Sequence, residues 1–391
     1  MTSNVIKVYA LLAITVLFDM SIQIAMIWKI LELTGSTVYM GIIVSIGAFT
    51  PYIISNIKRL SGKIYLTRNI FFLRLLLFFI TLISIMTNSV EITAVIFLIA
   101  IISSCNMICA INMFEIKNSS FVRDELIEAS NASRILQTTI QIGAFFGALL
   151  GGWLLKQYTL NEFFSYILIL SGLISLFNLF IPRHQSVAQK VNNQEIPELS
   201  QRESFFVPVL LTVLTGLHIG SFNAFVPIFY QLYRDWGPEV LGLASGLAGV
   251  GALGAALLPQ NKWVYLTSAF LIVIGDVGLF LLELPYLSIL FCLFIGYAVN
   301  SVRISSRTDI LKSKANEIDV NTAISNSNYY FYIVSGTVPM LIIMSLSFFS
   351  LSPLIYGVAL VLIGLATSIS ILILTIKQSV KPAQVLGESC D

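Results

Sequence analysis

Apolar runs of about 20 residues recur along the whole chain, and short polar intervals separate them. Each run is long enough to cross a bilayer, because about 20 apolar residues in a helix span the hydrocarbon core. The pattern therefore predicts twelve helical spans, with a few residues of uncertainty at each end. Their predicted limits are 6–31, 38–57, 69–87, 92–113, 131–155, 161–181, 205–230, 240–258, 263–282, 286–304, 322–349 and 354–376.

The longest polar interval, RHQSVAQKVNNQEIPELSQRES, covers residues 183–204. It is charged, contains Pro197 and lacks apolar periodicity. We expect it to be a linker between two halves of six spans each, at residues 1–182 and 205–391. The predicted fold class is an all-α polytopic membrane protein.

The composition agrees with a membrane protein and excludes several other classes. Of the 391 residues, 57% are hydrophobic and 11% are charged, whereas a typical soluble domain has about 25% charged residues. A formal net charge of +2, without a basic patch interleaved with aromatic residues, gives no indication of nucleic-acid binding. The sequence lacks a phosphate-binding Gly-Lys loop, an HExxH pattern and paired cysteine ligands. We therefore expect no cofactor, no metal and no enzymatic activity, and we exclude ATP-driven transport by this chain alone.

Lys and Arg are distributed unevenly between the two sides of the predicted membrane. With the N-terminus inside, the outer intervals contain only Lys29, Lys156 and Arg234, and most other basic residues fall in inner intervals. Inner loops of membrane proteins carry an excess of Lys and Arg. We therefore expect a multi-pass protein of the cytoplasmic (inner) membrane, with both termini and the linker in the cytoplasm.

Residues 121–155, FVRDELIEASNASRILQTTIQIGAFFGALLGGWLL, combine a short charged loop with an apolar helix. The polar and glycine positions of this helix are Gln137, Gln141, Gly143, Gly147 and Gly151. The glycines are four residues apart and therefore share one helix face. Small residues on a membrane helix let another backbone approach closely. A static packing face and a moving gate are the two interpretations of this glycine strip.

Three stretches resemble the macrolide- and siderophore-exporter branch of the major facilitator superfamily. They are the loop and glycine pattern of residues 123–152, the sequence FTPYI at 49–53, and the Leu-Thr-Gly-Ser turn within 25–41. In FTPYI, Pro51 removes a backbone hydrogen bond in mid-span and predicts a kink. The glycine pattern has Ala148 where exporters often have proline.

The resemblance implies a twelve-helix major facilitator fold, with the substrate site between two six-helix halves. It also implies a secondary exporter that works by alternating access and exchanges protons for a siderophore-like or drug-like small molecule. Two alternatives remain open, an importer of the same fold and a non-transporting membrane sensor or assembly factor. The expected partners are the small-molecule substrate, protons and the lipid bilayer, and we expect a monomer.

Asp19 is the main charged residue within the predicted spans, about thirteen residues into the first one. A charge at the bilayer centre costs about 2.5–3.5 kcal/mol or more, so such a residue usually faces a cavity or a partner. Gln23 follows one turn later on the same face. Because burial favours a neutral carboxyl group, Asp19 is a candidate for proton coupling or substrate binding. The alternative is a structural carboxylate that is hydrogen-bonded to neighbouring helices.

The two halves correspond when the sequence is shifted by 199 residues, which pairs Asp19 with His218. Spans 1 and 7 line the central cavity in the superfamily, so His218 is a second proton-coupling candidate, against the alternative of a satisfied polar group. Asp276 is interpreted as structural, because span 9 usually lies outside that cavity. The candidate substrate-binding residues are polar side chains of the predicted spans: Gln23, Asn106, Gln137, Gln141, Asn223 and Asn328.

Overall fold

The structure is a computed structural model that describes residues 3–61, 79, 92–123, 125–179, 205–258, 263–311 and 317–387. These residues form eleven α-helices and one short π-helix, and they contain no strand. The predicted span 69–87 lies outside the described residues except for Phe79, and the predicted linker 183–204 lies outside them entirely.

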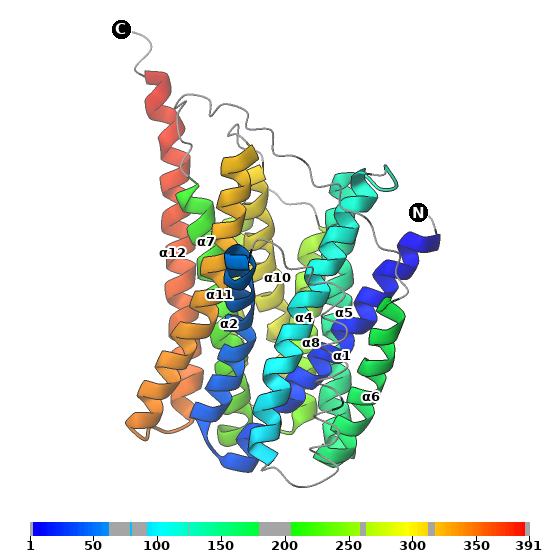
Figure 1. Cartoon of the computed structure of the whole chain (residues 1–391). Helices are drawn as coiled ribbons and strands as arrows, with labels where there is room; N and C mark the ends of the chain where they lie inside the picture. The colour runs from blue at the N-terminus through cyan, green and yellow to red at the C-terminus, as the bar shows by residue number, and fades with distance from the viewer. Residues whose placement is uncertain are drawn as a thin grey trace.

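The helices fall into two sets in chain order (Figure 1). The first set comprises α1 (Ser3–Thr34), α2 (Thr37–Ser61), α4 (Ile92–Arg123), α5 (Ala129–Gln157) and α6 (Leu160–Leu179). The second set comprises α7 (Phe206–Ile228), the π-helix η1 (Phe229–Tyr233), α8 (Pro238–Leu257), α9 (Val264–Leu281), α10 (Pro285–Leu311), α11 (Glu317–Phe348) and α12 (Leu354–Gly387). Each α-helix coincides with a predicted span. Both α4 and α12 continue well past the predicted limit, because apolar content marks the membrane and a helix can extend beyond it.

Eight of the described helical segments are long and apolar enough to cross a membrane, and three shorter apolar segments accompany them. A helix satisfies its backbone hydrogen bonds internally, which is a requirement for any segment surrounded by lipid. The chain is therefore an all-α, multi-pass membrane protein.

The chain begins and ends at the same end of the bundle, which we call the terminal end (Figure 1). The opposite end, where α1 passes into α2, is called the α1–α2 end. There Gly35 takes the left-handed conformation, with φ of 62°, and its N–H donates to the Leu31 carbonyl over 2.8 Å. Glycine adopts this conformation without strain, so the Leu-Thr-Gly-Ser sequence reverses the chain within a few residues.

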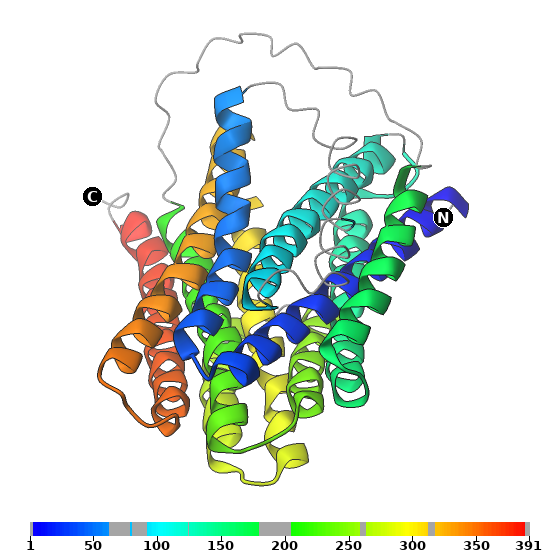
Figure 2. The ribbon, with the colours of Figure 1, turned by 60° about the horizontal axis from the view of Figure 1, so that its bottom comes forward.

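Most helix packing occurs within a set. Helix α1 packs against α4, α5 and α6, whereas α7 packs against α10, α11 and α12. Two pairs of helices, α5 with α8 and α2 with α11, make the main contacts between the sets. Figure 2 shows α2 and α11 side by side. A site between the sets is therefore bordered by these two pairs.

Candidate functional site

Helices α5 and α8 meet through glycines. A Cβ atom added at Gly152 would lie 2.6 Å from a backbone carbonyl oxygen of α8, and one at Gly242 would lie 2.6 Å from a carbonyl oxygen of α5. The two backbones are therefore in direct contact, with no room for a side chain between them. Closer to the α1–α2 end, Lys156 Nζ donates to Glu239 Oε1 over 2.7 Å across the same helix pair.

Helices α2 and α11 form the second contact between the sets. Ser45 Oγ donates to the Gly336 carbonyl oxygen over 3.0 Å, and both residues are buried. A Cβ atom at Gly336 would lie 2.8 Å from the Cβ of Ala48. At the first residue of α2, the Tyr356 hydroxyl of α12 donates to Thr37 Oγ1 over 3.2 Å. Hydrogen bonds and a small residue thus join the first set to the second along α2.

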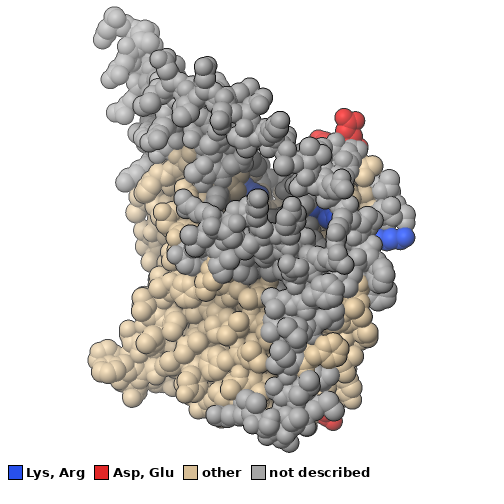
Figure 3. All heavy atoms as spheres, viewed as in Figure 1, with Lys and Arg blue, Asp and Glu red and all other residues tan. Residues whose placement is uncertain are grey.

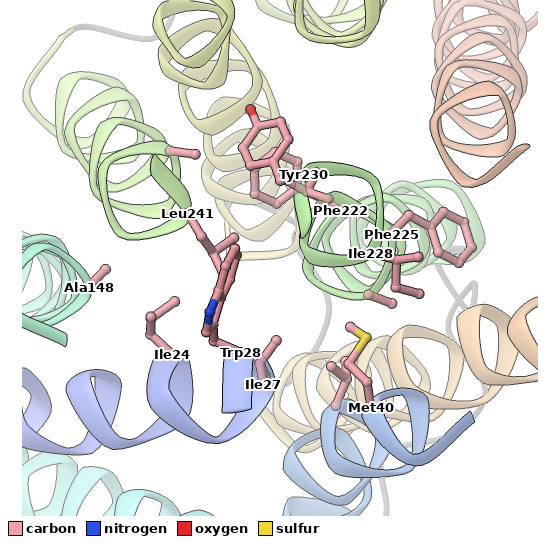
Figure 4. Close-up of a cluster of buried hydrophobic side chains, with 14 of the residues drawn as sticks. Ile24, Ile27, Trp28, Met40, Ala148, Phe222, Phe225, Ile228, Tyr230 and Leu241 are labelled. Carbon is pink, nitrogen blue, oxygen red and sulfur yellow. The ribbon is translucent and has the colours of Figure 1, made fainter. Parts of the chain in front are cut away.

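A buried apolar cluster fills the space between these two contacts (Figure 4). Its labelled members are Ile24, Ile27 and Trp28 of α1, Met40 of α2, Ala148 of α5, Phe222, Phe225 and Ile228 of α7, Tyr230 of η1, and Leu241 of α8. Side chains from five helices and η1 therefore exclude water at this level of the bundle. We call the α5–α8 contact, the α2–α11 contact and this cluster together the seal.

The seal lies toward the α1–α2 end. It uses the second halves of α1, α5, α7 and α11 and the first halves of α2 and α8, and all of these segments approach that end. Toward the terminal end, Figure 3 shows Lys and Arg atoms among the described residues. Among the described residues, the contacts that close the space between the two sets therefore lie toward the α1–α2 end.

Asp19 is buried in the middle of α1, with 2% of its surface exposed. Gln23, one turn further along, is half-buried. A Cβ atom added at Gly47 of α2 would lie 3.8 Å from Gln23 Nε2 and 3.9 Å from Ser104 Oγ of α4. The Gln23 amide therefore lies where α1, α2 and α4 meet. Proton coupling by Asp19 and substrate binding by Gln23 stay predictions.

His218 of α7 forms a buried pair with Asp276 of α9. Its Nε2 lies 2.8 Å from Asp276 Oδ2, and both side chains are fully buried. On α12, a Cβ atom at Gly364 would overlap the Asp276 carboxylate. Three helices of the second set therefore enclose this pair. The sequence correspondence links His218 with Asp19, whereas the hydrogen bond that the structure gives His218 is to Asp276.

The glycine strip of α5 lies against α1, within the first set. Cβ atoms added at Gly143, Gly147 and Gly151 would each meet a backbone carbonyl oxygen of α1, at 2.5 Å for Gly143 and 2.8 Å for Gly151. Ser21 Oγ of α1 donates to the Gly147 carbonyl oxygen over 2.8 Å. Gly152, which follows the strip directly, faces α8 and belongs to the seal. A gating role for the strip stays a prediction.

The other candidates differ in how far the structure describes them. Asn223 of α7 and Asn328 of α11 are exposed, and Gln141 of α5 is half-exposed. The side chains of Pro51, Asn106 and Gln137 lie outside the described part of the chain. Substrate binding by these asparagines and glutamines stays a prediction.

Sequence analysis did not single out the residues that join the two sets. Ser45 and Gly336 are ordinary residue types for a membrane helix, and only the fold shows that they meet. Gly152 could have been noticed, because the Gly-Gly pair at 151 and 152 must point to two different helix faces. Arg303 also escaped attention, although an arginine inside the predicted span 286–304 is unusual.

The sequence matches no protein-family model, and no curated protein matches it. Solved structures do match. A bacterial homolog of the human lysosomal transporter Spinster, in an inward-facing and unoccupied conformation, has 13% identity and a TM-score of 0.61, with 96% of each chain covered. The nucleoside transporter NupG, as its D323A mutant, also has 13% identity, with a TM-score of 0.63 over 94% of this chain and 99% of NupG. At this identity the likeness shows the fold alone, and the chain has the fold of major facilitator transporters.

Proposed function

We propose that the protein is a secondary active transporter that moves a small molecule across the membrane by alternating access. The observation that carries this proposal is the position of the seal, because the described contacts between the sets gather toward the α1–α2 end. In transporters built from two such halves, one half rocks against the other around a central site. A seal at one end of the space between the sets belongs to one of the two states that this mechanism requires.

The contacts of the seal are of a kind that can separate. Ser45–Gly336 and Lys156–Glu239 are single polar contacts between the sets, and the rest of the seal consists of packed side chains and touching backbones. Membrane helices associate mainly through such packing and through hydrogen bonds that contribute about 0.6 kcal/mol each. A rigid-body movement of one set can therefore break the seal without unfolding a helix.

The finer parts of the proposal come from the sequence. Export of a siderophore-like or drug-like molecule follows from the resemblance of residues 123–152, 49–53 and 25–41 to that branch of exporters. Proton antiport follows from Asp19, a carboxyl group buried in the middle of α1. The distribution of Lys and Arg predicts that the terminal end lies on the cytoplasmic side of the inner membrane.

Respiring everted membrane vesicles test this proposal directly. Respiration acidifies their interior, and an exported substrate exchanges for internal protons, which raises the internal pH. Candidate siderophores and macrolides should produce this alkalinisation in vesicles with the wild-type protein. Asp19→Asn imitates a permanently protonated side chain, and this variant should insert normally and abolish the pH change. The same vesicles should accumulate the active compound.

Each other result has a defined meaning. Alkalinisation of equal size with Asp19→Asn would remove Asp19 from proton coupling and leave it a structural role. Accumulation in whole cells but not in everted vesicles would indicate import. If no compound moved and Asp19→Asn changed nothing, the transporter proposal would fail, and a membrane sensor or assembly factor would be favoured.

A further inference from the structure

Arg303 lies in the apolar helix α10, one residue before the predicted limit of this span at residue 304. It precedes Leu311, the last residue of the helix, by eight residues, which is about 12 Å at 1.5 Å per residue. The apolar span of this helix runs from Pro285 to Ile310 and includes it. A charge inside a span is costly, and such residues usually face a partner or a water-filled cavity. Arg303 therefore needs an explanation in terms of what it faces.

The surroundings of Arg303 are aromatic and cationic. Its guanidinium carbon lies 4.5 Å from the centroid of the Phe331 ring on α11. Tyr332 follows Phe331 directly on α11, and Arg307 brings a second guanidinium to the same helix as Arg303. Arg307 follows four residues later, on the same face of α10, and is exposed.

The donors of Arg303 also lack acceptors in the described part of the chain. A guanidinium has five N–H groups, and a ring below it attracts the charge but accepts no strong hydrogen bond. No described residue is within hydrogen-bonding geometry of Arg303, and its side chain is only half-buried. No side chain among the described residues therefore competes with an anion for these N–H groups.

We propose that Arg303 is the centre of an anion-binding subsite that takes a carboxylate or phosphate group of an organic molecule. Phe331 holds the guanidinium in place, Arg307 adds a second positive charge, and the amide of Asn328 is available as a donor. Asn328 is exposed on α11, one turn before Phe331 and Tyr332. The subsite rests on the transport function proposed above, because it assigns an anionic class to the substrate of that transport.

An anion fits this place better than a neutral or cationic molecule for a physical reason. Planar guanidinium groups bind carboxylates and phosphates with two parallel hydrogen bonds. Two guanidinium groups on one helix face repel a cation, and each would lose hydration beside a neutral ligand without gaining a charge partner. An aromatic body on the ligand would gain further from the Phe331 and Tyr332 rings.

Protection of a single cysteine tests the subsite without knowledge of the natural substrate. The probes are benzoate and its neutral analogue benzamide, which differ in charge and have nearly the same shape. Asn328→Cys is introduced into the full-length chain after its four cysteines, Cys105, Cys109, Cys292 and Cys390, are replaced by alanine. The labelling rate with N-ethylmaleimide, which is neutral, is then measured in neutral detergent. Benzoate should slow labelling, and benzamide should not.

Two arginine variants place the effect at one residue. Arg303→Gln should raise the benzoate concentration needed for half-protection by about tenfold, since a hydrogen bond to a charged group contributes about 1.5–3 kcal/mol. Arg307→Gln, which removes the exposed charge of the same helix face, should raise it by a smaller factor. Equal protection by benzoate in wild type and Arg303→Gln would overturn the proposal, as would equal protection by benzamide.

A second measurement tests the subsite even if the cysteine-free chain does not fold. In the chain with its native cysteines, benzoate should raise the Tm more than benzamide does, and Arg303→Gln should abolish the difference. Equal Tm shifts in wild type and Arg303→Gln would count against the subsite.

The anionic group could come from a soluble molecule or from a lipid headgroup, and nanodiscs distinguish these sources. If lipid fills the subsite, phosphatidylglycerol nanodiscs should slow labelling relative to phosphatidylcholine nanodiscs, and Arg303→Gln should remove the difference. If the two nanodiscs give equal rates while benzoate still protects, the ligand is soluble. None of these assays needs transport, so failure of transport in vesicles would leave the anion subsite standing.

Discussion

Helix α5 contacts α1 and α8 through glycines on two different faces, and the two contacts differ in what joins them. On the α1 side, three glycines four residues apart touch the backbone of α1, and Ser21 donates to the Gly147 carbonyl oxygen inside the contact. On the α8 side, backbone contact at Gly152 continues into the exposed end of the helix, where Lys156 meets Glu239. The first contact lies within a set, and the second lies between sets.

The same division holds elsewhere in the molecule. Within the second set, His218 and Asp276 form a fully buried pair, and a Cβ atom at Gly220 of α7 would overlap the Ser335 carbonyl of α11. Between the sets, Ser45 makes a single hydrogen bond to Gly336. Both kinds of contact are closely packed, but among the described residues fewer side-chain hydrogen bonds join the two sets than join helices within a set. This difference is expected of two bodies that move as units.

The comparison predicts the largest loss of stability for the buried pair of the second set. His218→Leu leaves the Asp276 carboxyl group buried without its partner, which should lower the free energy of unfolding by about 3–5 kcal/mol. The double variant His218→Leu/Asp276→Leu removes both polar groups and should recover most of this loss. Thermal unfolding of the purified variants measures both effects. A double variant less stable than the single one would show that the pair is not the source of the effect.

Within the first set, Gly147→Ala should cause the next largest loss. The new Cβ would overlap the Leu17 carbonyl of α1, so α1 and α5 must move apart, which should cost about 1–3 kcal/mol. Gly254→Ala in α8 is the matched control, because a Cβ there would lie 3.7 Å from the Tyr297 ring, an ordinary contact. Equal Tm values for the two variants would contradict the rigid α1–α5 contact.

The helices could be predicted because a bilayer imposes one length and one polarity on every span. The glycine spacing indicates a helix face, but it carries no information about the partner of that face, and α1 is identified only by the fold. The pairing of His218 with Asp276 could not be predicted from the sequence for a similar reason. The two residues are 58 positions apart in the chain and lie on different helices. The 199-residue correspondence of the halves pairs His218 with Asp19 instead.

Between the sets, Ser45→Ala should change the conformational equilibrium more than the stability. Removing one hydrogen bond between membrane helices costs about 0.6 kcal/mol, so opening of the α1–α2 end should become about threefold more populated. Spin labels at the exposed residues Asn161 and Leu284, at the α1–α2 ends of α6 and α9, should then report a larger long-distance fraction. Ser345→Ala is the control, because Ser345 bonds only within its own helix. An equal response of both variants would count against Ser45.

The smallest effect is expected for Lys156→Gln, at the exposed end of the α5–α8 contact. The side chains of Lys156 and Glu239 are 54% and 24% exposed, so water and salt screen their attraction far more than they affect the buried Ser45 bond. Opening measured with the same spin labels should increase by less than with Ser45→Ala. The difference from wild type should disappear at high salt concentration. Exchange of the two charges, Lys156→Glu with Glu239→Lys, should restore the wild-type distances.

If Lys156→Gln opened the α1–α2 end more than Ser45→Ala did, and equally at high salt, the ion pair would be the contact that contributes most to keeping the seal closed. The contacts between the sets would then have to be ranked in the opposite order.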